Sequence, residues 1–339
     1  MTKNIFIVIA LIAITACSTE QVVKNFPRSE NIKMNEVALS DPLYSFGSMF
    51  TTDDYLAVYQ PRIDTMLFSF YDLDDLHFVF GGGRIGQGPN EFTDRPNRNF
   101  IITENNSFSS IDFPFFKHMN IDEEQLKVVR KDTIKIPAGL SPNNYSKLDE
   151  NVYCVTNIDP SKPFEFALFD KEGENPVWIS PVPNWTNLRQ DMPFIAYGGF
   201  IKANPKLKRF LVFYAYFRRI RMFDSQGNLQ KDISVEFPFK APPYEEAPGS
   251  KFSTYSIPYS DDKYIYVICH NAMTSENKVS TEMQIWNWNA EPVAVLYLDK
   301  GLHQFTISPK KRRLYATSPL DDVNNDKIFW CDLPDWLYK

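Results

Sequence analysis

Residues 78–92 read FVFGGGRIGQGPNEF, and this stretch decides the fold. Before it, residues 66–80 contain two strand-like segments around the acidic turn 72–75. Two β-rich runs that are joined by a short Asp-rich connection predict a hairpin. Five glycines then give the backbone conformational freedom, Pro89 predicts a turn, and Phe92 is expected to return the chain to a core.

The glycines of this stretch also match a nucleotide-binding spacing, since Gly81, Gly83 and Gly86 form G-x-G-x-x-G. That function requires a helix to begin inside the motif, with its N-terminus facing a pyrophosphate. Pro89 and the polar residues after it argue against such a helix, and no Lys-Ser or Lys-Thr pair follows for a phosphate loop. We therefore interpret the stretch as a connection between strands of an all-β protein.

Strand-like segments that alternate with polar turns recur along the whole chain. They form six units of about 50 residues, which is typical of the blades of a β-propeller. The segments are 55–59 and 66–80; 107–111, 116–121 and 126–136; 151–156, 164–170 and 176–179; 210–216, 220–224 and 229–235; 263–269, 282–288 and 292–298; and 304–308, 313–318 and 327–332. No stretch has a sustained 3.6-residue apolar period, so we expect few helices.

These units predict an all-β fold, a six-bladed β-propeller with four-stranded antiparallel blades. Residues 35–38 are expected to add a strand that closes the ring against the last blade. Aromatic residues, at 15% of the chain, favour strands.

The end of the glycine-rich stretch resembles the signature of a known family. Residues 86–92, GQGPNEF, are similar to the G-x-G-P-G-E-F motif of the TolB-like six-bladed β-propeller lipoproteins of Gram-negative bacteria. This chain has Asn90 where the family commonly has Gly, and Asn tolerates left-handed backbone better than most residues. The resemblance implies a propeller fold and a lipid-anchored protein.

The N-terminus has the order of a bacterial lipoprotein signal. Lys3 precedes an apolar run of ten residues, 5–14, which is too short to span a bilayer and has the length of a signal-peptide core. The sequence Ile14-Thr15-Ala16-Cys17 then resembles a lipobox, which implies cleavage before Cys17 and a diacylglycerol on its thiol. The alternative is a buried first helix with an incidental cysteine.

We therefore expect a lipoprotein signal peptide at 1–16, a lipidated and flexible tether at 17–34, and the propeller domain at 35–339. Several acyl chains give firm attachment, because each buried CH₂ contributes about 0.8 kcal/mol. The expected location is the cell envelope, on the periplasmic or the surface side of the outer membrane. We expect a monomeric domain.

Charge and cysteine content exclude some partners and leave others open. The formal net charge is −6, with 36 basic and 42 acidic residues and no long basic block, so nucleic acid is a poor partner. Besides Cys17, three cysteines lie in apolar strand-like runs, at Cys154, Cys269 and Cys331. We expect buried free thiols. The alternative is a single disulfide in an oxidising compartment.

Catalytic and metal-binding motifs are not found in the sequence. It contains no G-x-S-x-G, H-E-x-x-H or C-x-x-C. The segment 322–326 has the start of a calcium loop, D-x-N-x-D, but lacks the next glycine and has Leu333 at the position of the bidentate Glu. We expect turns there and at 72–75, and no metal or cofactor. The four scattered histidines are expected to be structural or exposed: His77, His118, His270 and His303.

Two long interruptions of the repeat suggest where a ligand binds. Residues 185–200 are aromatic and turn-rich, and residues 237–258 carry five prolines. Long loops of this kind are often functional. Trp185, Tyr197 and Tyr244 lie in these loops and are candidates for contact with a sugar or a partner; the alternative is that they are core aromatics that cap blades.

Two residues of the glycine-rich connection are further candidates for ligand binding. Arg84 and Gln87 either point into the central channel or hydrogen-bond to neighbouring loops and hold the ring together. The sequence thus favours a binding or scaffold module for a protein partner or an extracellular polymer. The alternatives are an enzyme of lyase or hydrolase type with its site in the channel, and a purely structural envelope component.

Overall fold

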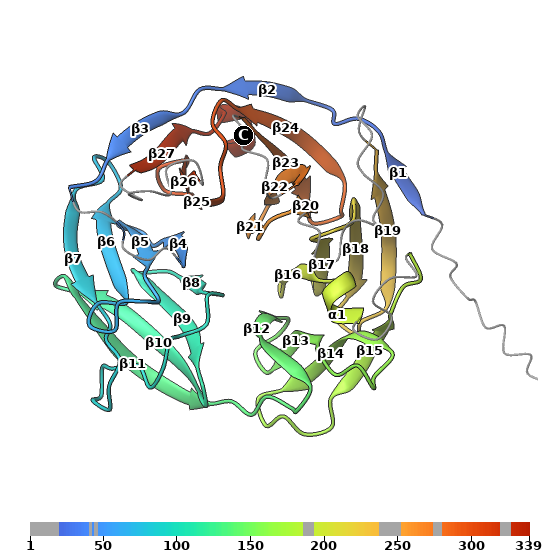
Figure 1. Cartoon of the computed structure of the whole chain (residues 1–339), viewed down its shortest axis with the longest axis horizontal. Coiled ribbons are helices and arrows are strands. Elements are labelled where there is room, and N and C mark those ends of the chain that lie inside the picture. The colour runs from blue at the N-terminus through green and yellow to red at the C-terminus, as the bar shows by residue number, and fades with distance from the viewer. Residues whose placement is uncertain are drawn as a thin grey trace, which may run out of the picture.

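The structure, a computed structural model, describes residues 20–40, 43, 47–185, 193–236, 252–273, 280–318 and 327–339. These residues form six β-sheets that surround a central axis, as Figure 1 shows. Each sheet is one blade, and the strands that follow one another along a blade pair in antiparallel order. The prediction of a six-bladed all-β propeller is confirmed.

The blades are numbered here along the chain, from the innermost strand of each to its outermost strand. Blade 1 contains β4 (Ser48–Thr51), β5 (Tyr55–Tyr59), β6 (Phe68–Asp72) and β7 (Phe78–Gly82). Blade 2 contains β8 (Ile101–Thr103), β9 (Ser107–Asp112), β10 (Phe115–Asp122) and β11 (Gln125–Thr133). Blade 3 contains β12 (Leu140–Lys147), β13 (Val152–Asn157), β14 (Phe164–Asp170) and β15 (Val177–Pro181). Blade 4 contains β16 (Gly199–Asn204), β17 (Arg209–Tyr214), β18 (Arg219–Asp224) and β19 (Leu229–Val235).

The last two blades depart from this simple order. In blade 5, both β20 (Phe252–Tyr255) and β21 (Tyr259–Ser260) pair with β22 (Tyr264–Met273), and β23 (Thr281–Asn287) and β24 (Pro292–Leu298) follow. Blade 6 contains β25 (Gln304–Ser308), β26 (Arg313–Thr317) and β27 (Lys327–Asp332), and its outermost strand is β3 (Asn35–Ala38) from the other end of the chain.

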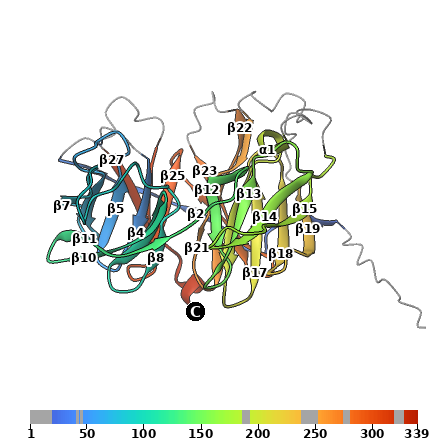
Figure 2. The same cartoon turned by 90° about the horizontal axis from the view of Figure 1, so that it is seen from below.

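Antiparallel order gives the ring two different faces. The loops between the second and third strands of a blade lie on the same face as the connections from one blade to the next. We call this the connection face. The tight turns between the first and second strands, and between the third and fourth, lie on the opposite face, the turn face. The short helix α1 (Pro193–Ala196) belongs to the connection from blade 3 to blade 4 and marks the connection face in Figure 2.

Three short strands at the start of the described chain form a belt around the outside of the ring. β1 (Gln21–Val23) runs parallel to β19, β2 (Ser29–Ile32) runs parallel to β24, and β3 pairs antiparallel with β27. Figure 1 shows the belt in blue along the rim of blades 4, 5 and 6. The prediction that residues 35–38 close the ring is confirmed.

The belt differs from the flexible tether that the sequence suggests for the residues before 35. Over residues 20–34, the chain supplies backbone partners to the outer strands of blades 4 and 5, whose edges otherwise expose unpaired N–H and C=O groups. Side chains add to this attachment. The Phe26 ring meets the Trp286 ring edge-on at 5.2 Å, and Trp336 Nε1 donates a hydrogen bond to Glu30 Oε2 at 3.0 Å.

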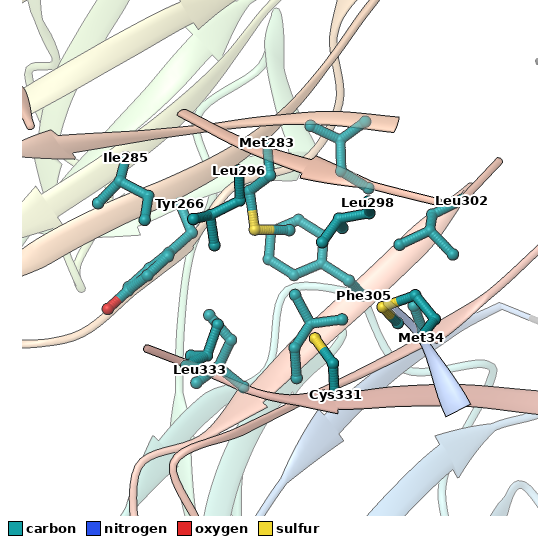
Figure 3. Packing of buried hydrophobic residues seen from close by; sticks show 14 of the residues in the cluster. Met34, Tyr266, Met283, Ile285, Leu296, Leu298, Leu302, Phe305, Cys331 and Leu333 are labelled. Atoms are coloured by element: carbon teal, nitrogen blue, oxygen red, sulfur yellow. The ribbon is translucent and has the colours of Figure 1, made fainter. Parts of the chain in front are cut away.

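Apolar side chains fill the space between neighbouring blades. Figure 3 shows the cluster between blades 5 and 6, where Met283 and Leu296 face Phe305 and Cys331. Met34, from the belt, completes this cluster and is only 4% exposed. Because a blade buries both of its faces against its neighbours, the core is complete only when the ring is closed.

Each of the three described cysteines is buried in a different cluster, and none of the three is in a disulfide. Cys154 lies on β13, Cys269 on β22 and Cys331 on β27. The expectation of buried free thiols is confirmed. Burial raises the pKa of Cys331 to about 12 and also raises the pKa of Cys154, so both thiols stay protonated and unreactive near neutral pH.

The sequence pattern does not predict five of the innermost strands, β4, β8, β12, β16 and β20, the last of which lies in the stretch 237–258 that the sequence predicts to be a loop. Each pairs with a single neighbour inside its own blade, because its other edge faces the central axis. Such strands are short or interrupted, as in LSPNNYSK of β12, and they carry little of the apolar alternation that marks a half-buried strand.

Shortening the belt is expected to lower the stability of the ring in steps. A chain that begins at residue 20 should melt like the full chain, and one that begins at residue 34 should melt lower because it loses β1 and β2. A chain that begins at residue 39 should be the least stable, since losing buried Met34 and half-buried Val37 costs about 3 kcal/mol or more. Thermal unfolding followed by circular dichroism measures this order. Equal melting of all three chains would contradict the role of the belt.

Candidate functional site

The glycine-rich connection between blades 1 and 2 is a loop that hydrogen-bonds to itself. The Glu91 carboxylate accepts hydrogen bonds from the Gly88 N–H at 2.6 Å and from Arg84 Nε at 2.5 Å. These two donors hold the pKa of Glu91 below its usual range. The Phe92 N–H donates to the Arg84 carbonyl at 2.8 Å, and the Phe92 ring is fully buried, as the sequence suggests. The motif therefore holds the connection between blades 1 and 2 in one conformation through its own hydrogen bonds.

Arg84 and Gln87 are both exposed on this loop. Arg84 forms its ion pair with Glu91 of the same loop, so its visible role is to stabilise the connection. Gly83 precedes it with a φ of +71°, and a Cβ at this position would lie 2.9 Å from the Phe68 ring. Only glycine fits this backbone conformation and this close approach without strain.

A buried ion pair lies beneath the loop and joins it to blade 2. Lys117 on β10 pairs with Asp112 on β9, and their side chains are 1% and 0% exposed. Lys117 Nζ also donates to the Glu91 carbonyl at 2.7 Å, while Asp112 accepts from the N–H groups of Thr93 and Asp94 at 2.8 and 3.0 Å. Hydrogen bonds thus compensate both buried charges, as a stable buried pair requires.

Two of the expected binding residues meet on the connection face between blades 3 and 4. Trp185 follows β15 and Tyr197 follows α1, and their ring centroids are 5.7 Å apart. The Trp185 N–H donates to the Tyr197 hydroxyl at 3.3 Å. Phe217, in the loop between β17 and β18, stacks on Tyr197 at 5.5 Å. Tyr197 is a core aromatic, only 7% exposed, while Trp185 and Phe217 are half-buried against it. We call Trp185, Tyr197 and Phe217 the aromatic cluster.

Two arginines of β18 lie over the half-buried Trp185 ring. Arg219 and Arg221 are two residues apart on one strand, so they share a face, and their guanidinium carbons lie 4.7 and 5.5 Å from the ring centroid. Such cation–π contacts contribute about 0.5–2 kcal/mol each. Arg219 also pairs with Asp232 and with Glu20 of the belt, both at 3.0 Å. The aromatic cluster is therefore tied to the start of the belt.

Arg221 connects this cluster to a buried carboxylate. Glu165 on β14 accepts hydrogen bonds from Arg221 Nη1 at 2.8 Å, Ser180 Oγ at 2.6 Å and the Tyr214 hydroxyl at 2.8 Å. Burial outweighs these three partners and raises the pKa of Glu165 to about 7. Glu165 and Ser180 belong to blade 3, and Arg221 and Tyr214 belong to blade 4, so the network links two blades.

A small pocket opens beside Glu165 on the same face. The loop between β13 and β14 and the connection after β15 supply its lining, which includes Asp159, Lys162, Val182 and Tyr197. It has room for about one water molecule, so it does not admit a sugar or a metabolite. The site therefore presents half-buried Trp185 and the arginines of β18 at the surface, above the buried network around Glu165.

Several other predicted features are not part of this site. Tyr244 and residues 322–326 lie outside the described residues. On the turn face, Asp72, Asp75 and His77 bring one possible ligand atom each within 4.8 Å of one another. The Asp72 carboxylate accepts the Asp75 N–H at 3.3 Å, and the Asp75 carboxylate accepts the His77 N–H at 3.1 Å. These bonds form the turn that the sequence predicts for residues 72–75.

A serine, a histidine and an aspartate that the sequence pattern does not connect meet on blade 2. Ser109 Oγ lies 2.9 Å from His118 Nδ1, and Asp132 Oδ2 lies 2.9 Å from His118 Nε2. A nucleophilic triad needs a serine that a substrate can reach, but Ser109 is only 4% exposed. Arg130 also approaches His118 Nε2, at 2.9 Å. These contacts are those of polar neighbours on adjacent strands.

Removing the buried carboxylate of Asp112 is expected to destabilise the protein strongly. Asp112→Ala leaves Lys117 as an uncompensated buried charge, which costs about 3–5 kcal/mol. The matched control is Asp122→Ala, which breaks the exposed pair of Lys127 with Asp122 and should cost at most about 1 kcal/mol. Urea unfolding gives both values. Equal losses in the two variants would show that the buried pair does not hold the loop.

The buried Glu165 carboxyl is expected to make stability depend on pH. Its pKa in the folded state, about 7, lies above the usual value of about 4.3, so its neutral form favours folding. This contribution is complete below the usual pKa and is lost as the pH rises through 7. The stability of the native protein relative to Glu165→Gln should therefore fall between roughly pH 4.5 and pH 7.5. Urea unfolding of both proteins at the two pH values measures the difference, and a constant difference would contradict the raised pKa.

Comparison with known proteins identifies the fold. No protein-family model matches the chain, and no curated protein matches its sequence. Among solved structures, the chain is similar to a member of the DUF4221 family from Bacteroides vulgatus, with a TM-score of 0.55 and 12% identity over 88% of this chain and 97% of that one. It is also similar to a Bacteroides fragilis protein described as exported, with a TM-score of 0.54 and 10% identity over 93% of this chain and 100% of that one.

At such identities the likeness is one of fold alone. The chain shares a β-propeller fold with these two Bacteroides proteins, and its own ring has six blades. Within the described ranges, no helix combines the length and apolar character needed to cross a bilayer.

Proposed function

We propose that this protein is a lipid-anchored propeller of the cell envelope that binds a partner protein through the connection face, around the aromatic cluster. The observation that carries the proposal is the composition of this surface. Half-buried Trp185 and the two arginines of β18 are residue types that are enriched at the energetic centres of protein interfaces, and buried Tyr197 supports the Trp185 ring. Phe217 extends the apolar part of the same surface.

The surroundings of the cluster favour a protein over a small ligand or a polymer chain. The adjacent pocket is too small for a sugar residue, and the Trp185 ring is engaged by Phe217 at 5.1 Å and by Arg219 over one face. A sugar-binding tryptophan offers a free face for stacking, whereas a protein interface buries the edges and rims of a fixed cluster. Buried Glu165 holds Arg221 in place, so the surface is preorganised.

Attachment through Cys17 rests on the sequence order of the lipobox and on the resemblance to TolB-like lipoproteins. The similar protein from Bacteroides fragilis is described as exported, which agrees with a location outside the cytoplasm. A lipid anchor also fits a binding module without a catalytic motif, since the anchor concentrates the partner-binding face near a membrane.

Site-directed cross-linking in the native envelope tests the proposed surface. A photoreactive residue at exposed Asn184, next to Trp185, is expected to give a protein adduct of one defined mass. The matched control places the same residue at Gln87, which is exposed on the connection face of another pair of blades and should not give this adduct. Asn184→Arg adds bulk and charge without removing any packing, and it should abolish partner binding while the melting temperature stays unchanged.

The outcomes separate the possible partners. An adduct at position 87 but not at 184 would move the binding surface to the glycine-rich loop. A polysaccharide that co-purifies with the protein, with no protein adduct at either position, would replace the proposed protein partner by a polymer.

A further inference from the structure

We infer that the rim of the ring that carries β1 faces the lipid surface, so that the propeller stands edge-on to the membrane. This inference rests on the proposed lipidation of Cys17 and adds an orientation to it. It depends on three observations: where the belt attaches, how few residues separate it from Cys17, and what the rim exposes.

The chain is fixed to blade 4 from its first described residue. Glu20 Oε1 pairs with Arg219 Nη2 at 3.0 Å, and the backbone of Gln21 then pairs with that of Ile233 on β19. The Glu236 N–H donates to the Val23 carbonyl at 2.9 Å. The N-terminal segment is thus held by an ion pair and by backbone bonds along the whole of β1.

Only two residues, Ser18 and Thr19, separate the proposed anchor from this attachment, so three Cα–Cα steps join Cys17 to Glu20. A chain spans at most about 3.6 Å per residue, so the Cα atom of Glu20 lies within about 11 Å of that of Cys17 whatever path the chain takes. A free tether up to residue 34 would instead reach about 60 Å. With the thiol carrying acyl chains in the bilayer, the start of β1 can never leave the zone next to the lipid headgroups.

The position of β1 decides which part of the ring comes closest to the lipid. β1 lies outside β19, at the outer edge of blade 4, as Figure 1 shows. An anchor on this edge brings the rim, and not the connection face or the turn face, to the membrane. The connection face and the turn face then stand roughly perpendicular to the plane of the membrane.

The rim at β1 has side chains that suit a lipid surface. Val22 on β1 is 47% exposed, although it is an apolar residue. Val177, on the outermost strand of blade 3, is also exposed. Lys24 follows β1, and its mostly exposed side chain pairs with the similarly exposed carboxylate of Glu236 at 3.5 Å, a contact that anionic headgroups can compete with.

This orientation also restricts the partner. Arg219 contacts both Glu20 of the belt and the Trp185 ring, so the aromatic cluster lies at the membrane-proximal end of the connection face. The partner must therefore present its docking surface close to the bilayer, as a membrane protein or another anchored protein does.

Fluorescence quenching by lipid headgroups tests the orientation. The full lipidated chain is reconstituted in vesicles of phosphatidylethanolamine and phosphatidylglycerol that carry a nitroxide on some headgroups. One variant, Val22→Cys, carries a fluorophore at β1. The control, Val129→Cys, carries it on β11 at the rim of blade 2, where Val129 is 64% exposed. Native Cys154, Cys269 and Cys331 are buried and should stay unlabelled in the folded protein.

The label at position 22 is expected to lose most of its fluorescence, and the label at position 129 to keep it. Inserting about twenty Gly and Ser residues between Thr19 and Glu20 should remove the difference, because the ring is then free to rotate. Equal quenching of both labels in vesicle-bound protein overturns the edge-on orientation and leaves lipidation intact. If the chain does not float with vesicles, or if Cys17→Ala floats equally well, the lipid anchor itself is wrong and the orientation fails with it.

Discussion

The antiparallel pairing of β3 with β27 is the interaction on which the rest of the structure depends. It supplies the outermost strand of blade 6 from the opposite end of the chain. The apolar clusters lie between blades, so a blade without its outer strand exposes residues on both of its faces. Met34, just before β3, packs in the cluster between blades 5 and 6, and Val37 on β3 packs against the cluster between blades 6 and 1. Closure therefore stabilises the ring through backbone pairing and through the completion of two clusters.

A closed ring gives fixed positions to the loops on its connection face, and two buried polar networks hold the loops in place. Asp112 and Lys117 hold the glycine-rich loop, while Glu165 and Arg221 hold the surface around Trp185. Around Asp112 and Lys117, hydrogen bonds from several elements compensate the buried charges, which is the condition for a buried ion pair to be tolerated. Around Glu165, three hydrogen-bond partners fix the position of the carboxyl group, although burial raises its pKa. Half-buried Trp185 and Phe217 are thus presented on a rigid support, as a preorganised interface requires.

Most of the fold could be predicted from the sequence, because the middle strands of the blades are short, largely apolar runs that end at polar turns. The part of the belt before residue 35 could not, since residues 20–34 are mostly polar and pair mainly through backbone groups, which leave no pattern in the side chains. The loop that contains Trp185 and Tyr197 was predictable as a candidate site. Phe217, Arg221 and Glu165 were not, because they come from other strands and loops of blades 3 and 4, which meet only when the two blades pack together.

The belt also determines the order in which this protein can fold. Asn35 pairs with Trp330, so the strand that completes the ring is made among the first and its partner among the last. Early blades can form local hairpins as they appear, but their outer faces stay unprotected until the end of the chain arrives. Contacts of such high sequence separation slow folding, because the chain loses the conformational entropy of closing a long loop before the paired strands contribute stabilising contacts. A ring that needs both ends of its chain assembles in one late, cooperative step.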